Sequence, residues 1–275
     1  MMDNYFWAYI DEGWIVIYMD DILIHVQTKE DLQKKTKKVL AKLKEHDLYL
    51  KLEKCKFAQE VEFLGMIVTK DTIMMDLLKL AGIRDWPVPT TFKQVCSFLG
   101  FGNFYCRFIS GFAHIARPLH NLMRKSKIWE WTTECQVAFD LLKEKFSTAP
   151  VLQMPDVSKP FALETNASKW AVRACLMQKD KNGQLHPCGY LSHALTNTER
   201  NWHTIIYALE EWKYLLLGAD HETVIHCDHK NLTYYCSPQQ LTARQAHWWN
   251  NLSQYNLKLI HVPGSKLIQA DALSH

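Results

Sequence analysis

Residues 13–26, GWIVIYMDDILIHV, constrain the fold of this chain more than any other stretch. Two apolar runs, WIVIYM and ILIHV, flank the adjacent aspartates Asp20 and Asp21. Short apolar runs that meet at a polar pair predict the two strands of a hairpin, with the aspartates at the turn. Neighbouring carboxylates repel each other, and a desolvated carboxylate is costly unless it is paired or binds a metal. The stretch therefore predicts either a paired charge or a metal ligand at this turn.

The composition bounds the classes of protein to which the chain can belong. Its 275 residues suffice for two domains or for one domain and part of another, and 48% apolar residues argue against wholesale disorder. The net charge of +3 favours an anionic partner only weakly. None of the eight cysteines forms a C-x-x-C pair, so free thiols are expected rather than zinc or disulfides. No signal peptide and no membrane-length apolar run is present, so we expect a cytoplasmic or nuclear protein that is not secreted and does not contact a membrane.

The sequence of the N-terminal quarter predicts two helices and two hairpins. Apolar spacing predicts a helix over 1–13 that ends at Gly13. Thr28 and Asp31 form a capping pattern that opens a second helix over 28–46. Lysines fill the outer face of that helix, which is typical either of a solvated surface or of contact with nucleic acid. The segment VEFLGMIV and the following DTIMM predict a second short hairpin.

The rest of the chain divides into a helical part and a mixed sheet. Residues 77–123 have helical spacing that is interrupted by two prolines at 86–89, and a further helix runs from Thr132 or Thr133 to near Pro150. Turn residues over 150–160 mark a domain boundary. Three strand-like runs then precede a helix that stops at Gly218 and a strand with Asp228 at its end. A helix over 244–255, a strand over 257–264 and a last short helix complete a mixed sheet with helices packed on it.

The chain resembles polyproteins of gypsy-type long-terminal-repeat retrotransposons over essentially its whole length. The resemblance rests on motifs that occur in the family's order, among them YMDDILI, LEKCKF, VEFLG, SFLGFGNFYCRFI, FALETNAS, YLSHALTNTERNW, DHKNL and ADALSH. It implies an α+β and α/β fold: a truncated reverse-transcriptase palm over 1–75, a helical thumb over 76–125, a connection over 126–158 and a ribonuclease H-like domain over 159–275.

The resemblance also implies a polymerase site at the first hairpin. Tyr18, Met19, Asp20 and Asp21 match a motif whose aspartates hold two Mg²⁺ ions against the nucleotide phosphates and the primer end. The turn at 63–66, formed by Phe63, Leu64, Gly65 and Met66, resembles the element that grips the primer strand. The family's other palm aspartate and its fingers belong upstream of this chain, so an upstream polyprotein segment is an expected partner.

The ribonuclease H motifs depart from the family pattern. The family uses four carboxylates around two Mg²⁺ ions, and Asn166 stands where the first aspartate belongs. The segment that carries the second acid is missing between Trp202 and the following helix, while Glu210 and Glu211 lie more than two turns, over ~10 Å, farther along. Asp228 and Asp271 match the remaining two positions.

Arg173 is a further departure from the family, which has a small residue there. An arginine in a sheet must reach water or a carboxylate, so we expect Arg173 at an edge or on a solvent-facing position.

Three functional hypotheses stay open at this stage. One is an active RNA-directed DNA polymerase and ribonuclease H that uses Mg²⁺. Another is a non-catalytic module that binds RNA–DNA hybrid or primer-template. The third is a decayed reading frame that has no selected function. The lost carboxylates favour a catalytically defective fragment, because losing one preorganised charge costs roughly two orders of magnitude or more in rate.

Overall fold

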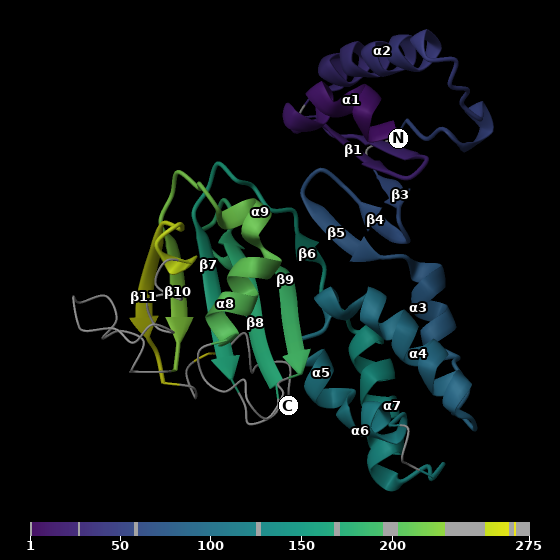
Figure 1. The fold of residues 1–275 in the computed structure, drawn as a ribbon, viewed down its shortest axis with the longest axis vertical. Coiled ribbons are helices and arrows are strands. Elements are labelled where there is room, and N and C mark those ends of the chain that lie inside the picture. The colour runs from purple at the N-terminus through teal and green to yellow at the C-terminus, as the bar shows by residue number, and fades with distance from the viewer. Residues whose placement is uncertain are drawn as a thin grey trace. The chain divides into compact units, whose positions relative to one another are not determined.

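The computed structural model describes residues 2–26, 28–57, 60–124, 128–167, 171–194, 203–228, 251–263 and 267. The chain divides into two compact units, Met1–Asp76 and Leu77–His275 (Figure 1). No helix within the described ranges is long and apolar enough to cross a membrane. The expected helices over 244–255 and 268–275 fall mostly or wholly outside these ranges.

The first unit combines helices with short antiparallel strands. Its elements are α1 (Met2–Asp11), β1 (Ile15–Tyr18), β2 (Asp21–Ile24), α2 (Lys29–Glu45), the 3-10 turn η1 (Leu52–Lys54), β3 (Val61–Phe63), β4 (Met66–Val68) and β5 (Thr72–Met75). The expected first hairpin is confirmed, since β1 and β2 pair antiparallel, but the expected turn at Asp20 and Asp21 is wrong by one residue, because Asp21 pairs with Tyr18 as the first residue of β2. The second region holds two successive hairpins rather than one, because VEFLGMIV itself turns at Leu64 and Gly65 and β5 then pairs with β4.

A small apolar core holds α1 and α2 against the first hairpin. The buried residues are Phe6 of α1, Trp14 just before β1, Ile15 of β1, and Val39 and Leu43 of α2. The predicted cap of α2 is confirmed, because the Thr28 hydroxyl accepts a hydrogen bond of 3.2 Å from the Asp31 amide. Packing and capping therefore fix α2 with its lysine-rich face outward.

The second unit begins with helices. These are α3 (Leu77–Arg84), α4 (Phe92–Phe104), the 3-10 turn η2 (Cys106–Phe108), α5 (Phe112–Ile115), α6 (Arg117–Leu122) and α7 (Thr133–Ser147). Aromatic side chains pack between them, with ring centroids 4.7 Å apart for Phe98 and Phe139 and 6.2 Å apart for Phe112 and Phe146. Thr132 caps α7 by accepting a hydrogen bond from the Cys135 amide, so the helix starts where its capping residue predicts.

The rest of the second unit combines strands and helices in the expected order. Its elements are β6 (Leu152–Gln153), β7 (Phe161–Ala167), β8 (Ala171–Lys179), β9 (Leu185–Ala194), α8 (His203–Glu211), α9 (Lys213–Leu216), β10 (Thr223–Cys227) and β11 (Leu257–His261). Five strands lie in the order β11-β10-β7-β8-β9, parallel within β11-β10-β7 and antiparallel within β7-β8-β9. The outer strand β9 carries Pro187 and a register shift opposite Leu176 and Met177.

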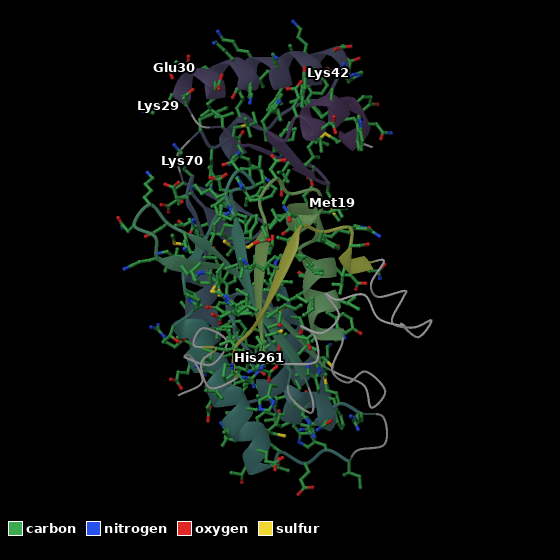
Figure 2. All side chains as sticks on the ribbon, turned by 90° about the vertical axis from the view of Figure 1, so that its left-hand side faces the viewer. Met19, Lys29, Glu30, Lys42, Lys70 and His261 are labelled. Atoms are coloured by element: carbon green, nitrogen blue, oxygen red, sulfur yellow. The ribbon has the colours of Figure 1, made fainter. Side chains whose placement is uncertain are left out.

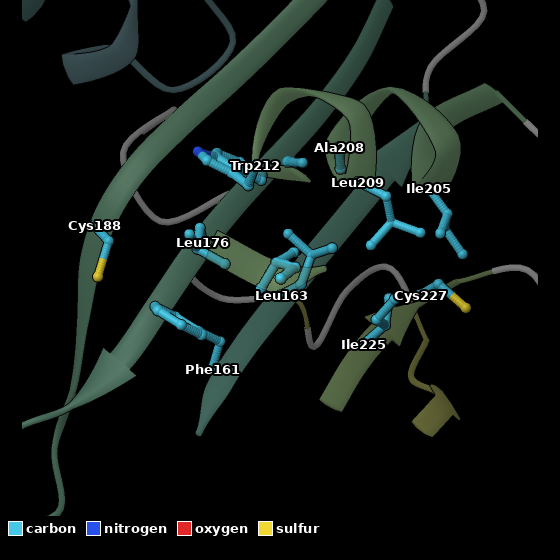
Figure 3. Packing of buried hydrophobic residues seen from close by; sticks show 12 residues of the cluster. Phe161, Leu163, Leu176, Cys188, Ile205, Ala208, Leu209, Trp212, Ile225 and Cys227 are labelled. Carbon is cyan, nitrogen blue, oxygen red and sulfur yellow. The ribbon is translucent and has the colours of Figure 1, made fainter. Parts of the chain in front are cut away.

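One face of this sheet is covered by α8 (Figure 3). Ile205, Ala208, Leu209 and Trp212 point from the helix toward the strands, where Leu163 belongs to the same buried cluster. The expected single helix ending at Gly218 is divided into α8 and α9, because the buried Trp212 has non-helical dihedral angles between them. Since side chains alternate along a strand, Glu164, Asn166 and Arg173 belong to the face opposite α8.

A buried glutamine ties the segment before β7 to the interior of the sheet. Gln178 of β8 is 0% exposed. Its side-chain oxygen accepts from the Asp156 amide at 2.9 Å, and its nitrogen donates to the carbonyls of Asp156 at 2.8 Å and Lys159 at 3.1 Å. The side chain therefore satisfies three backbone groups of one turn, which fixes the start of β7.

Candidate functional site

The first candidate site is the turn between β1 and β2. Tyr18 pairs with Asp21 across the hairpin, which leaves Met19 and Asp20 as a two-residue turn. Met19, labelled in Figure 2, has a φ of 54° and is 76% exposed, while Tyr18 is 50% exposed. A methionine in the left-handed region is unusual, and such strain occurs often at functional sites.

Both aspartates of this turn are exposed, and no ion pair joins either of them to a described residue. Their repulsion is therefore screened by solvent in this structure rather than relieved by a basic partner. Carboxylate oxygens are the ligands that hard dications such as Mg²⁺ prefer, so Asp20 and Asp21 fit part of a metal site. Within the described ranges, no three His, Cys, Asp or Glu side chains gather in one place.

The second candidate site is the turn between β3 and β4. Phe63 pairs with Met66, and Leu64 and Gly65 between them have φ values of 51° and 72°. Two consecutive positive φ angles are typical of a type I′ turn, whose twist matches that of the flanking strands. All four residues are half-buried. Their predicted contact with a primer strand stays a prediction.

The basic helix α2 presents several lysines to solvent. Figure 2 labels Lys29 and Lys42 along this helix. Two lysines have partners within the unit: Lys42 forms a 3.1 Å ion pair with Glu45, and the Lys35 Nζ lies 5.0 Å from the centroid of the Trp14 ring. The exposed lysines of this helix are Lys29, Lys34, Lys37, Lys38 and Lys44.

The third candidate site lies where β7 and β10 end side by side. Thr165 pairs with Cys227 in the parallel register, so the next residues, Asn166 and Asp228, occupy neighbouring positions at the carboxyl ends of both strands. Both are half-buried. The His261 Nε2 lies 3.2 Å from the Asp228 carbonyl oxygen, which links β11 to this edge. Asp271 and the gap after Trp202 lie outside the described residues.

The neighbouring row on the same face of the sheet is buried and titratable. Glu164, Cys175 and Tyr190 pair across β7, β8 and β9, and Glu164 is 9% exposed. Burial, and then the nearby Glu164 carboxylate, raise the pKa of the Cys175 thiol well above its usual value. Burial also raises the pKa of the Tyr190 hydroxyl, and it raises that of Cys188 to about 12. These thiols are therefore protonated near neutral pH and act as interior packing groups.

Arg173 is the cross-strand partner of Asn166 on one side and of Ser192 on the other. The expected edge position is wrong, because β8 is an inner strand; the side chain is half-buried, and its Nε is buried. The side chain lies against the segment that leads into α5. A Cβ atom added to Gly111 would lie 3.1 Å from the Arg173 Nε. The Ala113 amide, two residues on, donates to the Ser192 hydroxyl at 2.9 Å.

The two acids of α8 do not belong to the Asn166 edge. Glu210 and Glu211 are exposed near the end of the helix. Glu210 lies close enough to Tyr255 to raise its pKa, after burial, and Glu211 does the same for the Cys106 thiol. Both acids therefore interact with residues of other elements.

Comparisons with known proteins agree with this architecture. A family model described as reverse transcriptase (RNA-dependent DNA polymerase) matches residues 1–68. A model described as an RNase H-like domain found in reverse transcriptase matches residues 131–225. The retrovirus-related Pol polyprotein from transposon opus of Drosophila melanogaster is 35% identical in an alignment of 277 positions that covers 94% of this chain. The chain thus combines a reverse-transcriptase segment with an RNase H-like segment, and it is similar to retrotransposon Pol polyproteins over most of its length.

Other members and solved structures extend this relationship. The transposon Tf2-3 polyprotein of Schizosaccharomyces pombe is 33% identical over 96% of this chain. The chain spans 27% of the opus polyprotein and 20% of the Tf2-3 polyprotein. Domains of these families generally use divalent metal ions.

Two foamy viral structures share the fold. The protease-reverse transcriptase in complex with RNA/DNA hybrid has a TM-score of 0.75 at 23% identity, covering 96% of this chain and 37% of that one. A second structure, a complex with ds DNA, has a TM-score of 0.74 at 22% identity, covering 95% of this chain and 47% of that one. The expected fold class and the assignment as a reverse transcriptase and ribonuclease H-like fragment are confirmed.

Proposed function

We propose that this chain binds duplex nucleic acid, either RNA–DNA hybrid or primer-template, without cutting or extending it. The observation that carries the proposal is the register at the third site. Asn166 lies beside Asp228 and has Arg173 as its cross-strand partner on the other side, so the described row across β10, β7 and β8 runs from a carboxylate to an amide to a guanidinium.

The donor set at this edge does not fit a pair of hard dications. An amide oxygen is a neutral ligand, and a nearby guanidinium disfavours a divalent cation by like-charge repulsion. The family's chemistry needs several carboxylates to hold two metal ions and an attacking water. We therefore propose that residues 159–275 retain the ribonuclease H architecture but do not cleave RNA.

The donor set of the first turn fits a metal in part. Asp20 and Asp21 would hold Mg²⁺ through their carboxylate oxygens, with Tyr18 and Met19 shaping the turn. Bound there, Mg²⁺ would supply positive charge to nucleotide phosphates. The resemblance places the third palm ligand in an upstream polyprotein segment, so polymerase activity requires that segment as a partner.

Support for nucleic-acid binding comes from the foamy viral proteins of the same fold and from the positive charge of the lysines of α2. The foamy viral proteins of the same fold were solved in complexes with RNA/DNA hybrid and ds DNA. The exposed lysines of α2 offer a basic surface in the first unit, and cationic side chains bind phosphates by releasing counterions.

One reaction tests the catalytic half of the proposal. The purified chain is mixed with an end-labelled RNA–DNA primer-template, Mg²⁺ and deoxynucleotides, and the strands are sized on a gel beside an intact family enzyme as positive control. We expect unchanged strands with this chain. Shortened RNA or extended primer would refute the proposal, because another acid would then have to complete a metal site.

Fluorescence anisotropy with the same labelled hybrid tests the binding half. We expect affinity that falls steeply as salt rises, since phosphate contacts release counterions. Flat or absent binding would exclude the binding module and would leave a decayed reading frame as the better account of this chain.

A further inference from the structure

A cavity lies between the helices α8 and α9 and the segment 251–255 that leads into β11. Its volume is about 120 Å³. That volume holds roughly eight water molecules at about 15 Å³ each, which is about the number of heavy atoms in one pyrimidine base. In Figure 1, α9 lies at the end of the sheet where β10 and β11 begin, opposite the carboxyl ends of β7 and β10. The cavity is therefore separate from the Asn166 edge.

Hydrogen bonds join the walls of this cavity to each other. The Tyr255 hydroxyl donates to the Leu209 carbonyl oxygen of α8 at 3.4 Å. Tyr255 also forms an isolated antiparallel bridge with Leu217, just beyond α9, and its amide donates to the Leu252 carbonyl oxygen at 3.1 Å. The segment 251–255 is thus attached to both helices, so the cavity is formed before any ligand binds, as is usual for small-molecule sites.

Glu210 and Lys213 bring two opposite charges to this cavity without pairing with each other. On a continuous helix, residues three apart are neighbours that often form ion pairs. Here the helix is interrupted between them at Trp212, which has non-helical dihedral angles. Both side chains are exposed, and no ion pair joins either of them to a residue that the structure describes. The cavity therefore offers a carboxylate and an ammonium group to an occupant.

The remaining lining combines an apolar floor with groups that form hydrogen bonds. Asn251 contributes an amide, which can both donate and accept. A flat ring fits such a site, with its faces on the apolar side chains and its polar edge towards the amide and the carboxylate. The apolar side chains of the floor are Ile206, Leu209 and Leu252.

We propose that this cavity binds one unpaired nucleotide of a single-stranded nucleic acid, with an amino group of the base on the Glu210 carboxylate and the phosphate on Lys213. A nucleotide within a strand carries one negative charge, which matches the single ammonium group. Adenine, cytosine and guanine have an exocyclic amino group that a carboxylate accepts from, whereas thymine and uracil have none. The inference goes beyond the proposed function, which concerns a duplex, and it needs neither a metal ion nor the Asn166 edge.

The test compares two fluorescein-labelled single strands, oligo(dC) and oligo(dT), by anisotropy with the full chain. Both strands have the same length and the same number of phosphates, so a difference in affinity reports recognition of the base. Glu210→Gln removes the carboxylate from the cavity. Glu211→Gln is the matched control, because Glu211 is the next acid of α8 and does not line the cavity. Thermal melting of each variant verifies that it is folded.

We expect the wild type and Glu211→Gln to bind oligo(dC) at least about 5-fold more tightly than oligo(dT), the lower end of what one specific base contact contributes. Glu210→Gln should bind the two strands equally, because its amide can accept from the cytosine amino group and can donate to a thymine oxygen. Equal affinities in the wild type, no binding of either strand, or a preference that Glu210→Gln retains would each overturn the inference. None of these results concerns the RNA–DNA hybrid, so the proposed function is judged separately.

A lysine variant tests the phosphate contact. Lys213→Gln should weaken the binding of both strands by the same factor and reduce the slope of log K against log salt by about 0.7, the value of one phosphate contact on a single strand. Lys181→Gln is the matched control, because it removes one charge from the exposed turn after β8, and it should leave the slope unchanged. Equal slopes for the two lysine variants would overturn the inference.

Discussion

Replacing Gly111 with alanine should destabilise the C-terminal unit through two separable effects. The first is backbone strain, because a φ of 70° costs a residue with a Cβ atom about 1 kcal/mol or more. The second is overpacking, because the new Cβ would lie 3.1 Å from the Arg173 Nε and 3.2 Å from its Cζ. Overpacked sites typically cost about 1–3 kcal/mol. The total for Gly111→Ala is therefore about 2–4 kcal/mol.

Gly183 offers a matched control in the same unit. It has a φ of 80°, but a Cβ there would meet nothing within 4 Å. Gly183→Ala should therefore cost only the strain, about 1 kcal/mol. For a unit of this size, each 1 kcal/mol lowers the melting temperature by roughly 2–4 °C, so calorimetry resolves the two variants.

A double-mutant cycle then assigns the difference to Arg173. In an Arg173→Ala background the clash is absent, so Gly111→Ala should cost about as much as Gly183→Ala. The coupling energy between positions 111 and 173 should be about 1–3 kcal/mol, the cost of the overpacking. If Gly111→Ala costs no more than Gly183→Ala in the wild-type background, the described contact between Arg173 and Gly111 is wrong.

Four further predictions follow from the described contacts. Gln178→Leu should lower stability by about 2–3 kcal/mol in urea unfolding, because it removes the hydrogen bonds that Gln178 makes to the Asp156 amide and to the Lys159 carbonyl; a loss under 0.5 kcal/mol would contradict this. Thr132→Ala should cost about 1 kcal/mol by calorimetry, since it removes the cap of α7, and Thr132→Ser should restore most of it. Hydrogen bonds from the Ser158 hydroxyl and from Lys159 lower the pKa of Asp156 to about 2, so the stability that its carboxylate contributes is present above pH 4 and is lost as the pH falls towards 2. Wild type should therefore be more stable than Asp156→Asn above pH 4, by less than about 1 kcal/mol because the group is so exposed. Melting temperatures measured in an acid titration should show this difference vanish between pH 4 and pH 2. Asn166→Asp alone should not restore RNA cleavage on a sizing gel, because Arg173 remains its cross-strand partner, and a ladder of shortened RNA would disprove this.

Elements whose ends carry their own signals could be predicted from the sequence. The helix α2 starts at Lys29 because the Thr28 side chain caps it, and α7 starts after Thr132 for the same reason. The antiparallel pairing of β1 with β2 follows from two apolar runs that meet at a two-residue turn. The break at Trp212 was not predictable, because it depends on how a buried indole packs against the sheet.

The residues of the candidate site also divide into those whose positions the sequence predicts and those whose positions it does not. Asn166 and Asp228 could be placed together from sequence, because Asn166 lies near the end of one strand, Asp228 follows another, and the resemblance supplies the strand order. The position of Arg173 could not, because the face that it occupies depends on the register of β8 between two neighbours. Its contact with Gly111 joins residues far apart in the chain, and neither residue carries a local signal of the other.

The outer strand β9 also bears on how copies of this chain meet one another. An edge strand presents unpaired backbone groups to which a second chain can add a strand. Pro187 has no amide hydrogen to donate, and the register shift beside it bends the strand, so the row of donors along β9 is interrupted. Strand exchange or fibril growth between copies is therefore disfavoured along β9.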